Sequence, residues 1–215
     1  QMASSGARMA FGPADFLPLV EEASAELDLA LVSTLSDLAR LPEAGGALMP
    51  GKAQDLSYIQ YSSGSTRFPK GVMVTHANLM ANCHAMNSFG VRNDENDRAT
   101  SWLPFFHDMG LVGFVLGAVT SQASVDYLAT EDFARRPLTW LKILSETRGT
   151  MSYAPSFGYE LCARRVATMA EGALGLDLSS WRVAGIGGEM IKPNVMKAFA
   201  KAYKPYGFSD KAFCA

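Results

Sequence analysis

From residue 55 onward, short runs of β-branched and aromatic residues alternate with segments in which apolar positions recur at helical spacing. The runs predicted as strands are 56–61, 72–74, 100–103, 125–128, 150–153 and 181–186. Strands separated by helices of about ten to fifteen residues pair in parallel through right-handed crossovers. The pattern therefore predicts an α/β fold, a mostly parallel sheet flanked by helices on both faces.

Residues that start and stop helices agree with this alternation. Thr75 can cap a helix that runs to about Phe89, with Gly90 as its stop, and Pro137 suits the first turn of a helix that Gly149 ends. Two further helices are predicted, over 157–170 and 193–203. These boundaries place three of the four chemically suggestive segments at the junction between a strand and a helix, and the fourth between two strands.

The first 54 residues are harder to interpret. Apolar positions in 16–39 follow neither a helical nor a strand period, and 41–54 is rich in Gly and Pro, which favours an irregular connection. We therefore divide the chain into a segment over 1–54 and a chemically informative part over 55–215.

Composition limits the classes of function. With 19 basic and 21 acidic side chains the formal charge is −2, so the protein lacks the positive field that attracts nucleic acid. Hydrophobic residues make up 48% of the chain, enough for a core, but the longest apolar run is too short for a transmembrane segment. Three cysteines without metal spacing suit a reducing, cytoplasmic location.

The most informative segment is a hydroxyl-rich loop between two predicted strands. Its side chains and backbone amides can donate hydrogen bonds to phosphate oxygens, its glycine permits close backbone approach, and Lys70 adds a positive charge. The residues predicted to hold phosphate are Ser62, Ser63, Gly64, Ser65, Thr66 and Lys70. The lysine lies between Pro69 and Gly71, so the loop is not a Walker A motif.

This loop, read as YSSGSTRFPKG, resembles the phosphate loop of the adenylate-forming superfamily of acyl-CoA ligases, luciferases and peptide-synthetase adenylation domains. With the following GVMVTHANL it is most similar to the fatty acyl-AMP ligase branch. Arg67 replaces a glycine that is usual in the wider superfamily. The resemblance is clear from about residue 55 to the end of the chain and implies part of the large N-terminal domain of such an enzyme.

A second segment, LPFFHDMGLVG, follows a predicted strand and leads into an apolar helix. It resembles the acyl-site motif of the same branch. Its polar pair beside aromatic residues suits the carboxylate end of an apolar substrate, because the carboxylate needs partners and the alkyl chain needs apolar surroundings. We predict that His107, Asp108 and Met109 bind the substrate and that His107 faces the reacting centre, although a histidine can also merely bond nearby backbone.

Two more segments complete the candidate site. YAPSFGYELC resembles the next acyl-pocket segment, which would assign substrate contact to Tyr153 and Ala154, and it equally fits an ordinary strand-to-helix turn. In WRVAGIGGEM, a strand ends in paired glycines, against which a flat ring can lie. The resemblance assigns adenine contact to Gly187, Gly188 and Glu189, although a bare GGE is otherwise a tight turn.

The resemblance implies an enzyme, an ATP-dependent ligase that converts a fatty acid and ATP into acyl-adenylate and pyrophosphate and passes the acyl group to an acyl carrier protein. Lys70 and His107 would assist this step. Magnesium is expected with ATP, but no ligand for it can be named in this sequence. The alternatives are part of a fatty acyl-CoA ligase, or a non-catalytic nucleotide- or lipid-binding module.

Members of the family are much longer than 215 residues and carry a small C-terminal domain with an essential lysine. The sequence is therefore interpreted as a central fragment, expected to be inactive on its own.

Overall fold

A computed structural model describes residues 2–42, 45–47, 49–61, 70–169 and 173–214. The chain divides into two compact units, Gln1–Leu79 and Met80–Ala215, which are described separately. In the described residues, every helix is too short or too polar to cross a bilayer.

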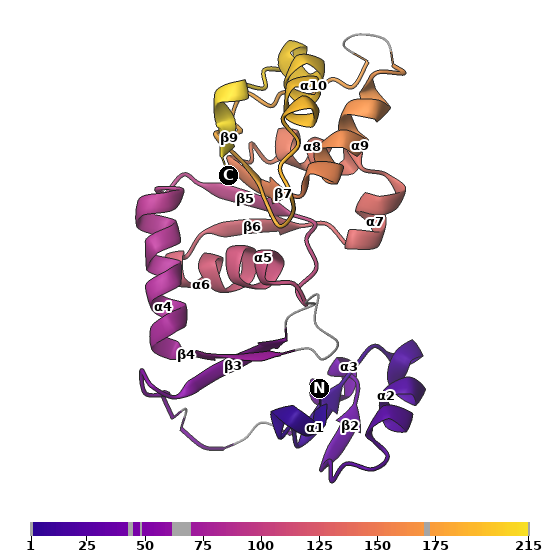
Figure 1. Ribbon diagram of the computed structural model, residues 1–215, viewed down its shortest axis with the longest axis vertical. Coiled ribbons are helices and arrows are strands. Elements are labelled where there is room, and N and C mark those ends of the chain that lie inside the picture. Colours follow the sequence, from indigo (N-terminus) through magenta and orange to yellow (C-terminus); the bar gives the residue numbers. More distant parts are fainter. Residues whose placement is uncertain (1, 43–44, 48, 62–69, 170–172, 215) are drawn as a thin grey trace. The chain divides into compact units, whose positions relative to one another are not determined.

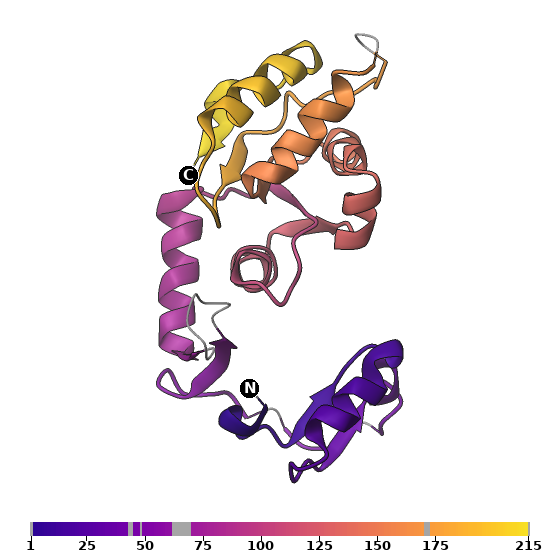
Figure 2. The same cartoon turned by 45° about the vertical axis from the view of Figure 1, so that its right-hand side comes forward.

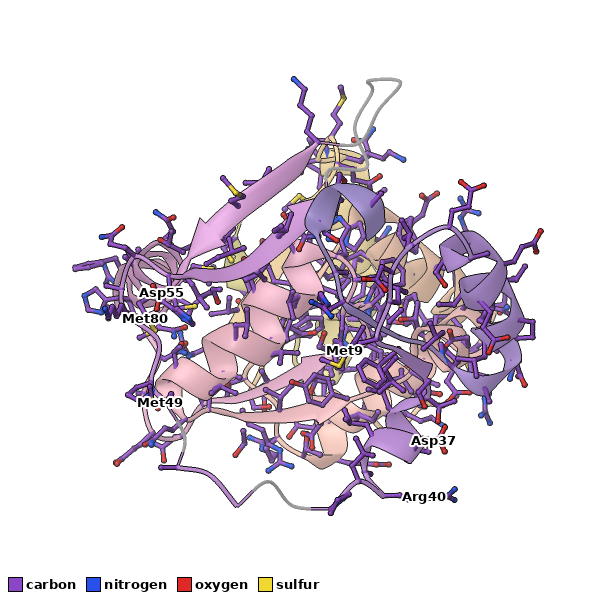
Figure 3. All side chains as sticks on the ribbon, turned by 90° about the horizontal axis from the view of Figure 1, so that it is seen from below. Met9, Asp37, Arg40, Met49, Asp55 and Met80 are labelled. Carbon is purple, nitrogen blue, oxygen red and sulfur yellow. The ribbon has the colours of Figure 1, made fainter. Side chains whose placement is uncertain are left out.

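The first unit begins with small elements in the segment that the sequence left unassigned. They are α1 (Met2–Ser5), β1 (Met9–Phe11), η1 (Ala14–Phe16), α2 (Leu17–Ser24), β2 (Leu31–Ser33) and α3 (Leu35–Leu38). Strands β1 and β2 pair in parallel, and α2 lies in the connection between them. Thr34 caps α3 by a reciprocal exchange with Asp37, and Arg40 lies beside Asp37 just after this helix (Figure 3). Elements of three or four residues are too short to show a hydrophobic period.

The predicted phosphate loop connects the two strands of a hairpin. Strands β3 (Leu56–Tyr61) and β4 (Gly71–Thr75) pair antiparallel, with Tyr61 opposite Gly71. Helix α4 (His76–Ala85) follows at once and continues into the π-helical η2 (Met86–Gly90). The predicted cap is confirmed, because Thr75 Oγ1 accepts the Asn78 amide at 3.2 Å while Asn78 Oδ1 accepts the Thr75 amide.

The second unit contains a five-stranded sheet, all of whose pairs are parallel (Figure 1). Its strands are β5 (Arg98–Ser101), β6 (Ser124–Tyr127), β7 (Met151–Ala154), β8 (Val183–Ile186) and β9 (Phe213–Cys214), in the order β6-β5-β7-β8-β9. The predicted fold class is confirmed. The strand expected at 100–103 lies two residues earlier, since the Ser101 hydroxyl accepts the Leu103 amide and turns the chain.

Helices cover both faces of this sheet (Figure 2). One side carries α7 (Thr130–Arg135), α8 (Leu138–Glu146), α9 (Ser156–Val166) and α10 (Pro193–Tyr203), and the other carries α5 (Asp108–Gly110), η3 (Leu111–Leu116) and α6 (Gly117–Ser121). Two adjacent residues of β7 show that successive side chains of a strand lie on opposite faces of the sheet. Ser152 accepts a hydrogen bond from Trp140 of α8, whereas Tyr153 packs edge-on against Phe114 of η3. The short η4 (Lys204–Tyr206) and η5 (Asp210–Ala212) precede β9.

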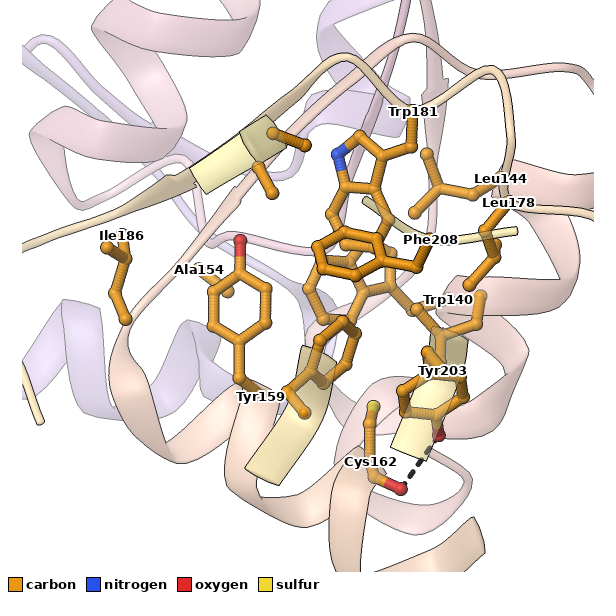
Figure 4. Close-up of a cluster of buried hydrophobic side chains, with 14 of the residues drawn as sticks. Trp140, Leu144, Ala154, Tyr159, Cys162, Leu178, Trp181, Ile186, Tyr203 and Phe208 are labelled. Carbon is orange, nitrogen blue, oxygen red and sulfur yellow. Dashed lines mark hydrogen bonds between the residues drawn. The ribbon is translucent and has the colours of Figure 1, made fainter. Parts of the chain in front are cut away.

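An aromatic core lies between the sheet and the α8–α10 layer (Figure 4). Trp140, Tyr159 and Tyr203 have no exposed surface, and each large apolar side chain buried in this way contributes about 2 kcal/mol or more. The polar atoms of these three side chains have partners inside the core, as when the Tyr203 hydroxyl donates to the Cys162 carbonyl at 2.8 Å. This core fixes β7, β8 and α9, whose ends carry the candidate site.

The end of α8 corrects one sequence prediction. The left-handed residue that closes the helix is Arg148, with φ of 55°, rather than Gly149. The Gly149 amide then donates to the Leu144 carbonyl at 2.8 Å, which completes a Schellman motif. Glycine is required at 149 for packing, because a Cβ there would lie 2.7 Å from Leu144 Cδ2.

Candidate functional site

The loops that follow parallel strands meet at one edge of a sheet, the carboxyl edge. In the second unit, His107 and Met109 follow β5, Tyr153 lies near the end of β7, and Gly187–Glu189 follow β8. Three segments that are separate in the sequence therefore converge on the same edge.

His107 is the N-cap residue of α5. Its Nδ1 lies 3.2 Å from the Met109 amide nitrogen and 2.9 Å from Asp108 Oδ1. An unprotonated Nδ1 accepts from the amide, and a protonated one donates to the carboxylate. Since Nδ1 is engaged in either state, Nε2 is the nitrogen that can meet a ligand. The His107 side chain is 50% exposed, so the structural role and a role toward a ligand are compatible.

Met109 connects the segment after β5 with the paired glycines after β8. Gly188 has φ of +77°, in the left-handed region that favours glycine, and a Cβ at this position would lie 2.8 Å from Met109 Cε. The next residue, Glu189, accepts the Phe157 amide of α9 at 3.3 Å through Oε1. The turn at Gly188 is thus held from two sides, by α5 and by the start of α9.

The two predicted substrate residues of β7 differ in what they present. The ring of Tyr153 lies flat on Gly185, where a Cβ would come within 1.9 Å of Cδ1, and its hydroxyl is 3.6 Å from Cys214 Sγ. Burial is the main cause that raises the pKa of Tyr153, and the contact with Cys214 raises it further, so the phenol stays protonated at neutral pH. Ala154 has no exposed surface and packs against Gly158 of α9, so neither its side chain nor its backbone is open to a ligand in the structure, and its substrate contact stays a prediction.

The predicted phosphate-binding residues belong to the first unit. Ser62, Ser63, Gly64, Ser65 and Thr66 lie outside the described residues, as does Arg67. Lys70 is described, is exposed, and immediately precedes β4. These assignments remain predictions.

Sequence reasoning missed two neighbours of the site. Cys214 contacts Tyr153 from the end of β9, and Phe157 supplies the amide that Glu189 accepts. Cys214 belongs to no motif, and Phe157 lies in the YAPSFGYELC segment without a role assigned to it. Each contact joins residues far apart in the sequence that only the order of the strands brings together. The exposed aromatic residues Phe105 and Phe106 were visible in the motif, and Phe105 stacks edge-on with Tyr127.

A groove of about 690 Å³ lies elsewhere, between α9 and α10. Its lining is mostly small and apolar, with Glu160, Arg164 and Lys201 among the polar residues, and it contains none of the residues of the predicted site. A groove of this volume could hold a small molecule. We assign the candidate site to the carboxyl edge instead, because the polar groups suited to a ligand converge there.

Comparisons with known proteins show which family and which relatives the chain is similar to. The family model described as AMP-binding enzyme matches residues 1–210. A putative acyl-CoA synthetase of Caulobacter vibrioides is 47% identical over 99% of the chain and 36% of its own length. A medium-chain-fatty-acid–[acyl-carrier-protein] ligase of Teredinibacter turnerae is 42% identical over 75% of the chain and 25% of its own length.

Solved structures extend the similarity to three dimensions. One, from studies of fatty acyl-adenylate ligases of E. coli and L. pneumophila, is 48% identical with a TM-score of 0.91, covering 99% of this chain and 38% of that one. An L. pneumophila fatty acyl-adenylate ligase in complex with acyl adenylate and pyrophosphate is 30% identical with a TM-score of 0.79, covering 99% of this chain and 36% of that one. The chain spans little more than a third of these proteins.

Proposed function

The chain belongs to the AMP-binding enzyme family, and from this premise we propose that it forms the central nucleotide- and acyl-binding part of a fatty acyl-AMP ligase. The reaction joins a fatty acid to ATP, giving acyl-adenylate and pyrophosphate, and the acyl group then passes to an acyl carrier protein. The observation that carries the proposal is the contact of Met109 with Gly188, because it joins the predicted acyl segment to the predicted adenine segment.

The chemistry of this reaction suggests a distinct role for each segment. The fatty-acid carboxylate attacks the α-phosphorus of ATP and pyrophosphate leaves, so catalysis requires alignment and neutralisation of negative charge. Lys70 and residues 62–66 would hold the β- and γ-phosphates, His107 Nε2 would border the carboxylate and α-phosphate, and Gly187–Gly188 would border adenine. Magnesium would supply further charge neutralisation; among the described residues, no group of three His, Cys, Asp or Glu side chains could hold it, so no ligand is assigned.

The fate of the acyl-adenylate distinguishes the proposed ligase from a fatty acyl-CoA ligase. A fatty acyl-CoA ligase uses the same first step, and the name of the Caulobacter relative favours it. Arg67 and the HDMG segment favour a carrier protein, as do the names of relatives such as the Teredinibacter ligase. A non-catalytic nucleotide- or lipid-binding module is the third possibility. A cytoplasmic location, inferred from the cysteines, is part of the proposal.

The decisive experiment measures fatty-acid-dependent exchange of pyrophosphate into ATP by the full-length protein. Acyl-adenylate is then offered with coenzyme A or with acyl carrier protein in separate reactions. We expect exchange, followed by transfer to the carrier protein. Transfer to coenzyme A alone would support the acyl-CoA ligase, whereas ATP binding by calorimetry without any exchange would support the binding module.

A further inference from the structure

The N-terminus of α9 lacks a cap from its own segment. Its N-cap residue is Pro155, which has no side-chain acceptor, so the first amides of the helix need partners from elsewhere. The Gly158 amide donates to the Pro155 carbonyl at 3.0 Å. The Phe157 amide donates to Glu189 Oε1, 32 residues further along the chain. A carboxylate at this position also interacts favourably with the helix dipole.

The same contact fixes a turn of the candidate site. Glu189 directly follows Gly188, whose left-handed backbone packs against Met109 Cε. The hydrogen bond to α9 therefore holds one end of the turn while Met109 supports its middle. Without the bond, the turn would still contact Met109, but this flexible side chain limits movement of Gly188 less than a hydrogen bond does.

Charge gives a second reason to place this carboxylate on a helix. A carboxylate left free in a site for an anionic nucleotide would weaken its binding by repulsion. In the structure its Oε1 is turned to the positive end of α9 and bonded to an amide. The carboxylate is therefore engaged by α9, and the predicted adenine contact of Glu189 would come from its backbone.

We propose that Glu189 is a positioning residue. Its carboxylate caps α9 and thereby holds Gly187–Gly188 in the position at which adenine would bind. The proposal rests on the proposed function, since it names how one wall of that site is kept in place. Glu189 then acts on nucleotide binding through the glycine turn, without touching the reacting atoms.

The test compares Glu189→Ala with Glu189→Gln in the full-length protein, because glutamine keeps an acceptor oxygen and loses the charge. Glu160→Ala is the matched control, a glutamate on the same helix that pairs with Arg164 away from the site. We expect Glu189→Ala to raise the KM for ATP about fivefold, the worth of one ordinary hydrogen bond, with kcat within twofold. Glu189→Gln and Glu160→Ala should stay within twofold of the wild type in both.

Hydrogen exchange at the Phe157 amide supplies a readout that does not depend on catalysis. It should accelerate about fivefold in Glu189→Ala and stay near the wild-type rate in Glu189→Gln. Unchanged exchange, a glutamine variant as impaired as the alanine variant, or a fall in kcat at constant KM would overturn the proposal. If the wild-type protein shows no pyrophosphate exchange, the proposed function fails, and the amide measurement still decides whether Glu189 caps α9.

Discussion

The two edges of the five-stranded sheet use polar residues in opposite ways. At the amino edge, Asp97, Thr150 and Arg182 immediately precede β5, β7 and β8 and bond one another. Arg182 makes a two-pronged contact with Asp97, whose side chain is 2% exposed, and Thr150 Oγ1 donates to the same carboxylate at 2.7 Å. Arg182 also donates to two carbonyls of the 91–92 turn. This edge satisfies its own polar groups.

At the carboxyl edge, the polar groups bond mainly to backbone and stay open to solvent. The His107 and Asp108 side chains are 50% and 67% exposed, and a glycine in a left-handed conformation follows β8. Burial and ion pairing at one edge allow the other to keep exposed polar groups that contribute little to folding. The same sheet thus carries a stabilising ion pair at one edge and the proposed binding groups at the other.

The largest effect concerns whether the carboxyl edge suffices for catalysis. We expect the 215-residue polypeptide alone to show no measurable fatty-acid-dependent pyrophosphate exchange. Removing a single charge-stabilising group from an active site typically lowers the rate by about a hundred- to a thousandfold, and the chain covers only 38% of a similar solved ligase. The assay uses a panel of fatty acids with the full-length protein as positive control. Robust exchange by the short polypeptide would mean that the edge is a complete site.

The next effect separates two residues of the proposed site in the full-length protein. His107→Ala should lower kcat of pyrophosphate exchange by about a hundredfold, because we assign this side chain to the reacting groups, while loss of its helix cap lowers the free energy of unfolding by only about 1 kcal/mol. Lys70→Ala should instead raise the KM for ATP, by about tenfold, through loss of one charge-assisted phosphate contact. Equal and negligible effects of both substitutions would contradict the assigned roles.

At the amino edge we expect the reverse, a substitution that lowers the free energy of unfolding without lowering the rate of pyrophosphate exchange. Arg182→Ala leaves the buried Asp97 carboxylate with only Thr150 and the Asp94 amide. Breaking a buried pair costs about 3–5 kcal/mol, and partial exposure of Arg182 brings our expectation to about 2–3 kcal/mol by urea unfolding. The control is Arg136→Ala, an exposed pair expected to cost under about 1 kcal/mol. Similar losses in the two variants would remove the contrast between the edges.

Acid should weaken the amino edge selectively. Burial alone would raise the pKa of Asp97, but hydrogen bonds from Arg182, the Asp94 amide and Thr150 outweigh it and hold the pKa below its usual value. A carboxyl with a lowered folded-state pKa stabilises the fold above its unfolded pKa of about 3.9, and this contribution is lost as pH falls through the folded pKa. The difference in unfolding free energy between wild type and Asp97→Asn should be constant at neutral pH and narrow below about pH 5. A gap independent of pH would refute the linkage.

The features that could be predicted from the sequence are those set by residues close together in the chain. The Thr75 cap, the helix opened by Pro193 and the strand 56–61 all follow from local chemistry and period, and the structure confirms them. The segments that meet at the carboxyl edge could also be anticipated, since parallel strands bring their ends together. The roles of individual site residues remain predictions.

The contacts that hold the edges together could not be anticipated. Arg182 and Asp97 are 85 residues apart, and Glu189 and Phe157 are 32 apart, so only the strand order places them side by side. The cap of α9 shows the difficulty, because the local sequence offers a proline and gives no hint that a distant glutamate replaces it. The elements within residues 1–40 were missed for a different reason, because most of them are too short to show a hydrophobic period.

The smallest effect contrasts two glycines of the second unit. Gly188→Ala places a side chain in the left-handed region and against Met109, and should destabilise the protein by about 1–2 kcal/mol. Gly113 lies in η3 with nothing within 4 Å of a Cβ, so Gly113→Ala should stabilise by about 0.5–1 kcal/mol through reduced freedom of the unfolded chain. Urea unfolding of both variants measures the difference. Adding Met109→Ala to Gly188→Ala separates the two causes, because it removes the steric contact and leaves the backbone strain. If the double variant regained the stability of Met109→Ala alone, packing rather than backbone conformation would be the reason for glycine at 188.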